Sequence, residues 1–264
     1  MTQANWVLQA GSVVTALETA ALPEALATLL RHVAPFDYTV MFGYLGTARP
    51  IDLHDDFPIG KRKVFVTDYQ AGPYLLDPFY LAATRSVAPG LYRLRDLAPD
   101  RFYQGEYFRN YYIQTGLAEE IAYFVDLPLG CLAVLSLMRT ERQFSQKEFH
   151  ALKAAFPFVA AAAQRQWSRL AHRFGDADQT TGEKGLKGRD AFVFGNFGDG
   201  VLTRREREVA EFTLKGHSAQ SVGALLNISP GTVRIHRRNI YAKLRINSQG
   251  ELFARFLATR LGPS

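Results

Sequence analysis

The sequence predicts two folded regions of different class: an α+β region with one antiparallel sheet and flanking helices, then an all-α region of four short helices. In residues 1–172, strand-like segments alternate with stretches of helical periodicity, a pattern typical of α+β domains. In residues 200–264, four apolar-periodic stretches follow one another with only short capped turns between them. We therefore expect an N-terminal domain over 1–172, a linker over 173–199 and a C-terminal domain over 200–264.

The N-terminal elements are predicted from periodicity and turn residues. Pro128-Leu129-Gly130 separates two apolar strands and predicts a hairpin turn. Ser145-x-x-Glu148 is a capping box that predicts the start of one long helix, running to about His172 and bent at Pro157. This helix is equally compatible with a dimer seam and with burial inside one subunit. The remaining expected elements are helices over 5–20, 23–33 and 100–112, and strands over 38–45, 51–57, 118–127 and 131–138.

Between these regions, residues 173–200 are polar and rich in glycine, which predicts a flexible linker.

Composition excludes several classes of protein. With 47% hydrophobic and 21% charged residues, the chain has the make-up of a globular protein. No apolar run approaches the roughly 18 residues that span a bilayer, and residues 1–10 lack the features of a signal peptide. The single cysteine, Cys131, excludes an internal disulfide framework. We expect a cytoplasmic protein with no membrane partner.

Each predicted C-terminal helix begins at a recognisable cap. Thr203 with Glu206 forms a capping box, and the first helix is expected to end at Gly216. Ser218 is expected to cap the second helix. A short turn then leads to Ser229-Pro230, an N-cap followed by proline at the first helical position. The third helix is expected to turn Val233, Ile240 and Leu244 inward, and Ser248-x-x-Glu251 caps the fourth.

Charge is distributed unevenly between the two regions. Residues 200–264 contain eleven Lys and Arg against four Glu, whereas the preceding residues contain 20 basic and 21 acidic residues. A basic excess confined to one domain is typical of binding to the phosphate backbone of nucleic acids. Two helices joined by a three-residue turn, the second rich in arginine, predict a DNA-binding helix-turn-helix.

The stretch from Leu202 to Leu244 resembles the four-helix DNA-binding domain of LuxR-type transcription regulators. Three positions depart from the usual pattern of that family: Ser221 stands in place of Glu, Gly223 in place of Ala, and Gln249 in place of Arg. The matching positions are Leu202, Thr203, Arg205, Glu206, Glu208, Val209, Gly216, Ser218, Ile228, Ser229, Thr232, Val233, His236, Asn239, Ile240, Lys243 and Leu244.

The resemblance implies roles for residues on the recognition helix and around it. Arg234, Ile235 and Arg238 occupy positions that face base edges in the major groove, where arginine grips guanine and isoleucine contacts a thymine methyl. Arg237 is expected on the same basic face. Phosphate contacts are expected from Thr232, Lys215, Ser218 and Lys243. The implied partners are double-stranded DNA, a second copy of the chain in a homodimer, and RNA polymerase.

Three kinds of signal-receiving module compete for the N-terminal region. A phosphoacceptor receiver is disfavoured, because the first acidic residues are Glu18 and Glu24 and no receiver framework follows. An acyl-homoserine-lactone module, as in some LuxR-type regulators, is suggested by Tyr74-x-x-Asp77-Pro78 and Thr115-Gly116-Leu117. The tryptophans of such a pocket have no counterpart here. The third candidate is a GAF- or PAS-like sensor, which the order of elements also suits.

A small-molecule ligand, such as an amine or amino acid, is suggested by the unusually aromatic middle of this region. Glu119 and Glu120 are adjacent on a predicted strand, so only one can face the interior. A module that binds a protein partner is the rival interpretation. No catalytic constellation, metal-ligand spacing or cofactor motif is present, so we expect no enzyme, metal or cofactor. The candidate ligand residues are Tyr38, Phe42, Tyr44, Tyr74, Asp77, Phe79, Tyr107 and Glu120.

Overall fold

The computed structural model describes residues 3–85, 87–178 and 197–261. They pack as two compact units, each described by itself. The first, called the sheet unit, comprises the described residues within 1–62, 82–97 and 117–185, and the second, the helical unit, comprises those within 63–81, 98–116 and 186–264. The domain boundaries predicted at 172 and 200 differ from the limits of these two units, and they stay a prediction.

A five-stranded, wholly antiparallel sheet in the order β2-β1-β5-β4-β3 forms the centre of the sheet unit. The predicted α+β class is confirmed. The predicted turn at 128–130 joins β4 to β5, with Leu129 and Gly130 at φ +61° and +74°. Strand β3 was not expected from the sequence. The strands are β1 (Tyr38–Leu45), β2 (Ile51–Asp55), β3 (Gly90–Arg93), β4 (Glu119–Asp126) and β5 (Cys131–Arg139).

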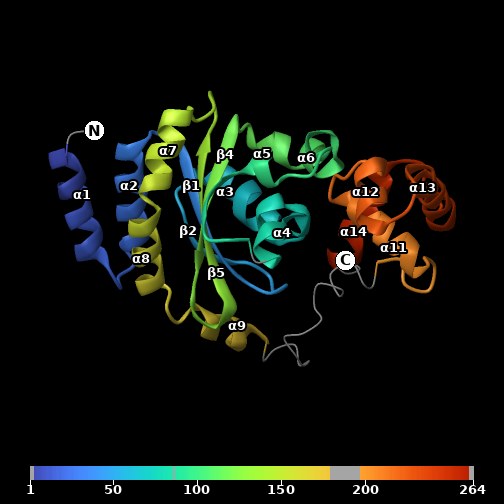
Figure 1. The fold of residues 1–264 in the computed structure, drawn as a ribbon. Coiled ribbons are helices and arrows are strands. Elements are labelled where there is room, and N and C mark those ends of the chain that lie inside the picture. Colours follow the sequence, from blue (N-terminus) through green and yellow to red (C-terminus); the bar gives the residue numbers. More distant parts are fainter. Residues whose placement is uncertain (1–2, 86, 179–196, 262–264) are drawn as a thin grey trace. The chain divides into compact units, whose positions relative to one another are not determined.

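Helices cover one face of this sheet in two successive layers (Figure 1). Alternate strand residues such as Met41, Tyr123 and Leu135 are fully buried in one core with α2 (Leu22–Val33), whose leucines recur at helical spacing. Helix α1 (Gln3–Ala16) packs outside α2.

The long helix predicted over 145–172 is in fact three helices: α7 (Gln146–Ala154), α8 (Phe156–Gln166) and α9 (Leu170–Asp178). The Ser145 capping box is present as predicted. The first break falls at Ala155, two residues before Pro157, because proline cannot donate to the preceding turn and is accommodated in a first helical turn. Helix α9 also occupies 173–178, which the sequence assigned to the linker; residues 179–196 lie outside the described part.

The opposite face of the sheet is also buried and mostly apolar. It carries Val40, Phe42 and Tyr44 of β1 and Phe124 of β4, none of which belongs to the core under α2. Burial of both faces explains why β1, β4 and β5 read as continuous apolar runs.

An ion pair is buried at one end of the sheet. Arg93 of β3 contacts the Glu119 carboxylate, which also accepts a hydrogen bond of 2.6 Å from the Phe144 backbone N–H. Strand alternation places Glu119 and Glu120 on opposite faces, but both are buried. The expectation that only one of them faces the interior is therefore wrong, because both faces of the sheet are covered. Glu119 is therefore a structural residue, and only Glu120 stays a ligand candidate.

The helical unit begins with short segments instead of the single helix expected over 100–112. Gly105 interrupts that stretch in an extended conformation, so the chain turns before α6 (Glu106–Asn110). Single turns of 3₁₀ helix cover Phe102–Gln104 and Tyr112–Thr115. Other short helical elements among the described residues are α3 (Ile59–Arg62), the π-helix Lys63–Asp68, the 3₁₀ turn Pro73–Leu76, α4 (Pro78–Thr84) and α5 (Leu94–Leu97).

The four predicted C-terminal helices are confirmed, and their caps lie where the sequence predicts them. Thr203 and Glu206 form both bonds of a capping box, and Ser218 and Ser229 each accept the N3 backbone N–H of their helix. Val233, Ile240 and Leu244 are buried as predicted. The helices are α11 (Arg204–Leu214), α12 (Ala219–Leu226), α13 (Pro230–Leu244) and α14 (Gln249–Leu261). Among the described residues, no helix has the length and apolar character needed to cross a membrane.

Candidate functional site

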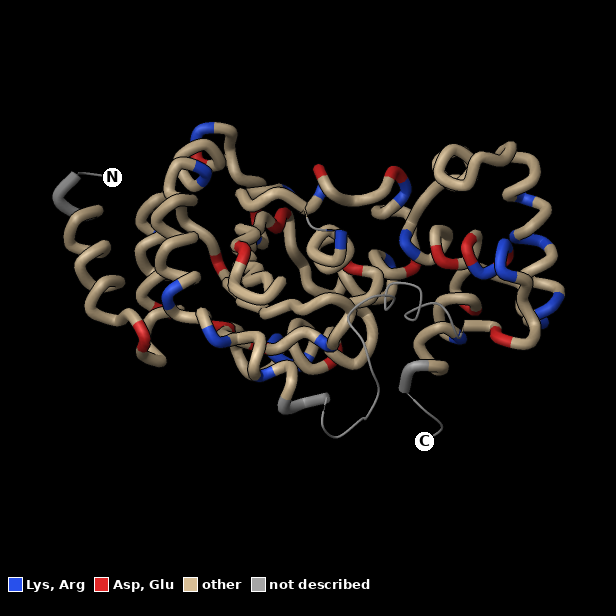
Figure 2. The backbone as a smooth tube through the Cα atoms, turned by 60° about the horizontal axis from the view of Figure 1, so that its bottom comes forward, with Lys and Arg blue, Asp and Glu red and all other residues tan. Residues whose placement is uncertain are grey.

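The outer face of α13 is basic and free of acidic residues. Its four charged residues are all Lys or Arg, and Figure 2 shows such residues recurring along the C-terminal helices. Arg234 and Arg238 are exposed, one helical turn apart, and Ile235 between them keeps 51% of its surface exposed. An exposed Arg–Ile–Arg face on a helix of fifteen residues has the chemistry needed to read a major groove.

Arg237 lies on the same helix, but it is held against its neighbours. Its Nε donates to Thr213 Oγ1 and its Nη2 to the His217 carbonyl, both at 3.0 Å. Burial lowers the pKa of this guanidinium, and the nearby Arg101 and Arg234 lower it further. Arg237 therefore ties α13 to α11 and to the turn before α12.

Two of the predicted phosphate contacts are engaged in ion pairs. Lys243 Nζ lies 2.7 Å from Glu206 Oε2, and Lys215 Nζ lies 2.5 Å from Glu211 Oε1. Burial raises the pKa of Glu206, but hydrogen bonds from Lys243 and Thr203 outweigh it and leave the pKa below its ordinary value. Lys215 is buried, whereas Lys243 keeps 39% of its side chain exposed.

Ser218 and Thr232 lie in the first turns of α12 and α13. The Ser218 hydroxyl accepts the Ser221 N–H at 3.0 Å, and the Thr232 N–H donates to the Ser229 hydroxyl at 3.0 Å. The Ser218 N–H is bonded to Asp100 Oδ1, also at 3.0 Å. No local sequence signal pointed to Asp100, which is 118 residues away from Ser218 along the chain.

The three departures from the family pattern have local explanations. Ser221 places its hydroxyl 3.0 Å from His217 Nδ1, and Gln249 donates to the Thr213 carbonyl at 3.2 Å. At Gly223 a Cβ would lie 2.7 Å from the Ile228 carbonyl oxygen, so the turn between α12 and α13 has closed over this position. Each substitution is thus accommodated within the four-helix domain.

Half of the ligand candidates lie on the sheet, on the face away from α2. Phe42 and Tyr44 are buried neighbours with ring centroids 6.3 Å apart. Met138 of β5 pairs with Tyr38 of β1 on one side and with Glu120 of β4 on the other. Tyr38 and Glu120 therefore lie on either side of Met138 in one row across the three strands. The sheet unit therefore brings these four candidates onto a single face.

Asp77 lies in the helical unit among tyrosines. Its Oδ2 accepts the Tyr69 hydroxyl at 2.6 Å and its Oδ1 the Phe79 N–H at 2.9 Å. Asp77 is half-buried, and burial raises the pKa of its carboxyl to about 6 even though these hydrogen bonds lower it. The surrounding rings are Tyr69, Tyr74, Tyr80 and Tyr111, with Tyr74 and Tyr80 packed edge to face at 4.9 Å.

Tyr107 and Phe79 are buried in the same unit, and Tyr74 is half-buried. Tyr107 packs against Phe102 and Tyr111, with ring centroids 5.8 and 5.4 Å apart. Packing explains the burial of Tyr107 without a ligand.

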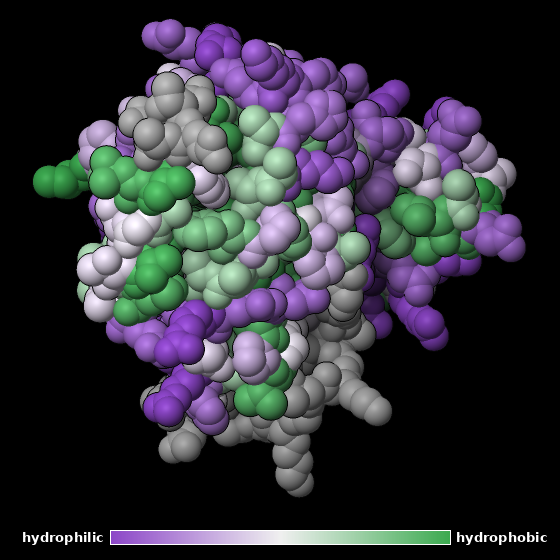
Figure 3. All heavy atoms as spheres, turned by 60° about the vertical axis from the view of Figure 1, so that its left-hand side comes forward, coloured by the Kyte–Doolittle hydropathy of each residue, from purple (hydrophilic) through white to green (hydrophobic). Residues whose placement is uncertain are grey.

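Helix α1 presents an uncharged surface. Val7, Leu8 and Val14 keep 64%, 67% and 59% of their surface exposed on a helix that contains no charged residue. Figure 3 shows hydrophobic side chains gathered on this side of the molecule. Exposed apolar side chains grouped in this way are typical of protein contact surfaces.

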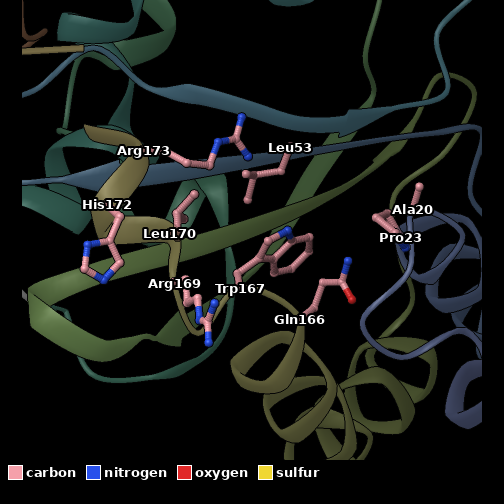
Figure 4. Close-up of a pocket in the computed structure, with 9 residues that line it drawn as sticks. All are labelled: Ala20, Pro23, Leu53, Gln166, Trp167, Arg169, Leu170, His172 and Arg173. Carbon is pink, nitrogen blue, oxygen red and sulfur yellow. The ribbon is translucent and has the colours of Figure 1, made fainter. Parts of the chain in front are cut away.

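A separate surface hollow of about 800 Å³ lies in the sheet unit, where α8 leads into α9 (Figure 4). The Trp167 indole lies beneath Leu53, whereas Arg169 and His172 point away from that ring. The Gln166 amide donates to the Thr19 carbonyl at 2.8 Å. None of the eight candidate ligand residues lines this hollow.

In the part of the chain that the structure describes, no group of three or more His, Cys, Asp or Glu side chains is placed to hold a metal ion.

Comparison with known proteins identifies the C-terminal domain. Residues 200–256 match the model of the family described as bacterial regulatory proteins, luxR family. A putative HTH-type transcriptional regulator of Aeromonas salmonicida is 33% identical over 187 residues, covering 69% of this chain and 93% of the relative. The transcriptional activator protein PhzR of Pseudomonas fluorescens is 28% identical over 179 residues, which cover 67% of this chain and 63% of that protein.

A solved structure resembles the N-terminal region. The VqsR LBD domain of Pseudomonas aeruginosa superposes with a TM-score of 0.54 at 24% identity, covering 61% of this chain and 96% of that one. The likeness concerns the fold and agrees with the antiparallel sheet and its helices. The relatives are DNA-binding transcriptional regulators and not enzymes. The match to the family model and the similarity to the Aeromonas salmonicida relative agree with each other, and the fold is consistent with both. This chain belongs to the LuxR family of bacterial regulatory proteins.

Proposed function

We propose that this LuxR-family regulator binds a small molecule in its N-terminal region and that the ligand controls operator binding by α13. The observation that supports ligand binding most directly is Asp77, a half-buried carboxyl among tyrosines. Among the described residues, its donors are the Tyr69 hydroxyl and the N–H groups of Phe79 and Tyr80. A carboxylate offers about four acceptor positions, so one is left for a ligand donor.

The chemistry of Asp77 favours a ligand that carries an N–H donor. A partly desolvated carboxylate gains more from a charged or amide donor than from water, and aromatic faces attract cations. An amine or amino acid would supply an ammonium group, and an acyl-homoserine lactone would supply an amide N–H. The sheet-face candidates Tyr38, Phe42, Tyr44 and Glu120 stay predictions for further ligand contacts.

For DNA, we propose that Arg234, Ile235 and Arg238 read base edges. They are exposed and project from one face of α13. Thr232, Ser218 and Lys243 are proposed as phosphate contacts, and Lys215 would have to leave Glu211 to become one. Arg237 acts mainly by holding α13 in place, because neighbouring acceptors already bind its guanidinium.

We also infer a homodimer that binds a two-fold symmetric operator with half-sites about 10 bp apart. The exposed apolar stripe of α1 supports a self-contact, because two copies could bury Val7, Leu8 and Val14 against each other. RNA polymerase is a proposed partner on the strength of the family alone.

A thermal-shift screen of the full chain tests ligand binding. The panel holds amines, amino acids, aromatic acids and acyl-homoserine lactones. A ligand at 100 times its dissociation constant stabilises the fold by about 2.7 kcal/mol, which raises the melting temperature. The shift should be lost in Asp77→Asn and kept in Asp96→Asn, whose carboxylate is largely exposed. No shift across the panel would favour a protein partner as the signal.

A further inference from the structure

The N-terminus of α12 holds an anion that comes from elsewhere in the chain. Asp100 Oδ1 accepts the Ser218 backbone N–H at 3.0 Å, and the Ser218 hydroxyl also interacts with this carboxylate. These hydrogen bonds, together with nearby His217, outweigh desolvation and lower the pKa of Asp100. The carboxylate is therefore ionised at neutral pH and lies at the positive end of a helix dipole.

The segment that carries Asp100 fits closely onto the turn between α11 and α12. The Arg101 N–H donates to the Gly216 carbonyl at 3.0 Å, and Arg101 directly follows Asp100 in the chain. Gly216 has φ +94°, and a Cβ there would meet Phe102 Cα at 3.0 Å. A residue with a side chain at 216 would thus be strained and crowded, and the close approach at Gly216 together with the Arg101 hydrogen bond fixes the position of Asp100.

A basic cleft of about 480 Å³ opens beside the contact. Arg101, Arg234 and Arg237 line it together with Asp100 and Ser218. Arg234 is one of the proposed base-reading residues, so the cleft adjoins the DNA-reading face of α13. Neither Arg101 nor Arg234 forms an ion pair with a carboxylate in the described part of the chain, and the only acid lining this cleft is Asp100.

In helix-turn-helix domains the first helix of the motif crosses the DNA backbone, and helix N-termini bind phosphate oxygens through backbone N–H groups. Here that helix is α12, and the Ser218 N–H and hydroxyl at its start are both bound to Asp100. We propose that Asp100 is an intramolecular competitor of a DNA phosphate: its carboxylate occupies the Ser218 donors and restrains the domain from full backbone contact.

This inference rests on the DNA-binding function of the family, and it does not require the proposed ligand. The second predicted phosphate contact near this turn, Lys215, is likewise engaged, in its ion pair with Glu211. Release of the segment at 98–105 frees the Ser218 donors and removes a negative charge from the path of the DNA backbone. Any signal that moves this segment then changes affinity for DNA.

The test uses the full chain and a fluorescently labelled 30-bp duplex of arbitrary sequence, followed by anisotropy at several salt concentrations. Asp100→Asn keeps the side-chain shape and removes the charge, and Asp100→Ala removes both. Asp100 is exposed apart from this contact, so neither change threatens the fold. Asp96→Asn is the matched control, because it removes an equal charge from an exposed site four residues away.

We expect both Asp100 variants to bind the duplex about 3- to 10-fold more tightly than wild type, the net worth of one ordinary hydrogen bond. The slope of log K against log salt should steepen by about 0.9, for one added phosphate contact. Asp96→Asn should change little. Equal effects of Asp96→Asn and Asp100→Asn, or weaker binding by the Asp100 variants, would overturn the proposal. Arg238→Ala reports separately on the DNA interface, since it should weaken binding whatever Asp100 does.

Discussion

Asp77→Asn is expected to change the dependence of stability on pH in a defined direction. Burial raises the pKa of Asp77 to about 6, from 3.8 when it is unperturbed. Between these values the folded state binds more protons than the unfolded state, so this group lowers stability as the pH rises from about 4 to about 6. The destabilisation is complete above pH 6 and vanishes below pH 4.

The magnitude follows from the size of the shift. Two pKa units correspond to at most about 3 kcal/mol of destabilisation at pH 7 and about 1 kcal/mol at pH 4.5. Asparagine does not ionise, and its side-chain oxygen can still accept the Phe79 N–H. Its hydrogen bond with the Tyr69 hydroxyl is weakened, which lowers the free energy of unfolding by about 1 kcal/mol at every pH. The free energy of unfolding of the variant, relative to wild type, should therefore rise by about 2 kcal/mol from pH 4.5 to pH 7.

Urea denaturation of both proteins at pH 4.5, 5.5, 6.5 and 7.5 measures this difference, provided that the m-values agree. Asp96→Asn serves as the control, because it makes the same substitution at a largely exposed carboxylate. A difference for Asp77→Asn that stays constant with pH, or that falls as pH rises, would refute the assignment of Asp77 as a desolvated carboxyl.

Further predictions concern the sheet unit and the cap of α11. Arg93→Met should lower the free energy of unfolding by about 3–5 kcal/mol, because it removes the buried ion-pair partner of Glu119, and Arg95→Met, at an exposed position, should cost far less. Burial raises the pKa of the Cys131 thiol to about 11, so iodoacetamide at pH 8 should label it only on unfolding; rapid labelling of the folded chain would contradict its burial. Thr203→Ala should destabilise by about 1 kcal/mol in urea denaturation, through loss of the N-cap, and Thr203→Ser should restore most of that loss.

The C-terminal helices could be predicted because their signals are local. Thr203, Ser218 and Ser229 each satisfy a backbone N–H three residues ahead, so cap and helix start appear together in the sequence. The same holds for the 128–130 turn. Strand β3 is only four residues long and pairs with β4, far away in sequence, so its periodicity was too short to recognise.

Contacts between distant residues could not be predicted. Gly105 divides the helix expected over 100–112, because the chain there turns towards Gly216, more than a hundred residues ahead. The ion pair of Glu119 with Arg93 joins two strands and has no local signal in the sequence. Of the DNA-facing set, the exposure of Arg234, Ile235 and Arg238 follows from helical periodicity, whereas the anchoring of Arg237 depends on Thr213 and His217 from other elements.

The central claim is that α13 reads DNA through its exposed Arg–Ile–Arg face. The most direct test selects bound sequences from a random duplex library with the wild-type chain, then measures the affinity of Arg238→Ala for the selected site. We expect a loss of about 1–3 kcal/mol on that site and relaxed preference at one base pair. Arg204→Ala, which removes a 90% exposed arginine of α11, should have little effect. Equal losses in the two variants, or unchanged preference in Arg238→Ala, would contradict the assignment of α13 as the reading helix.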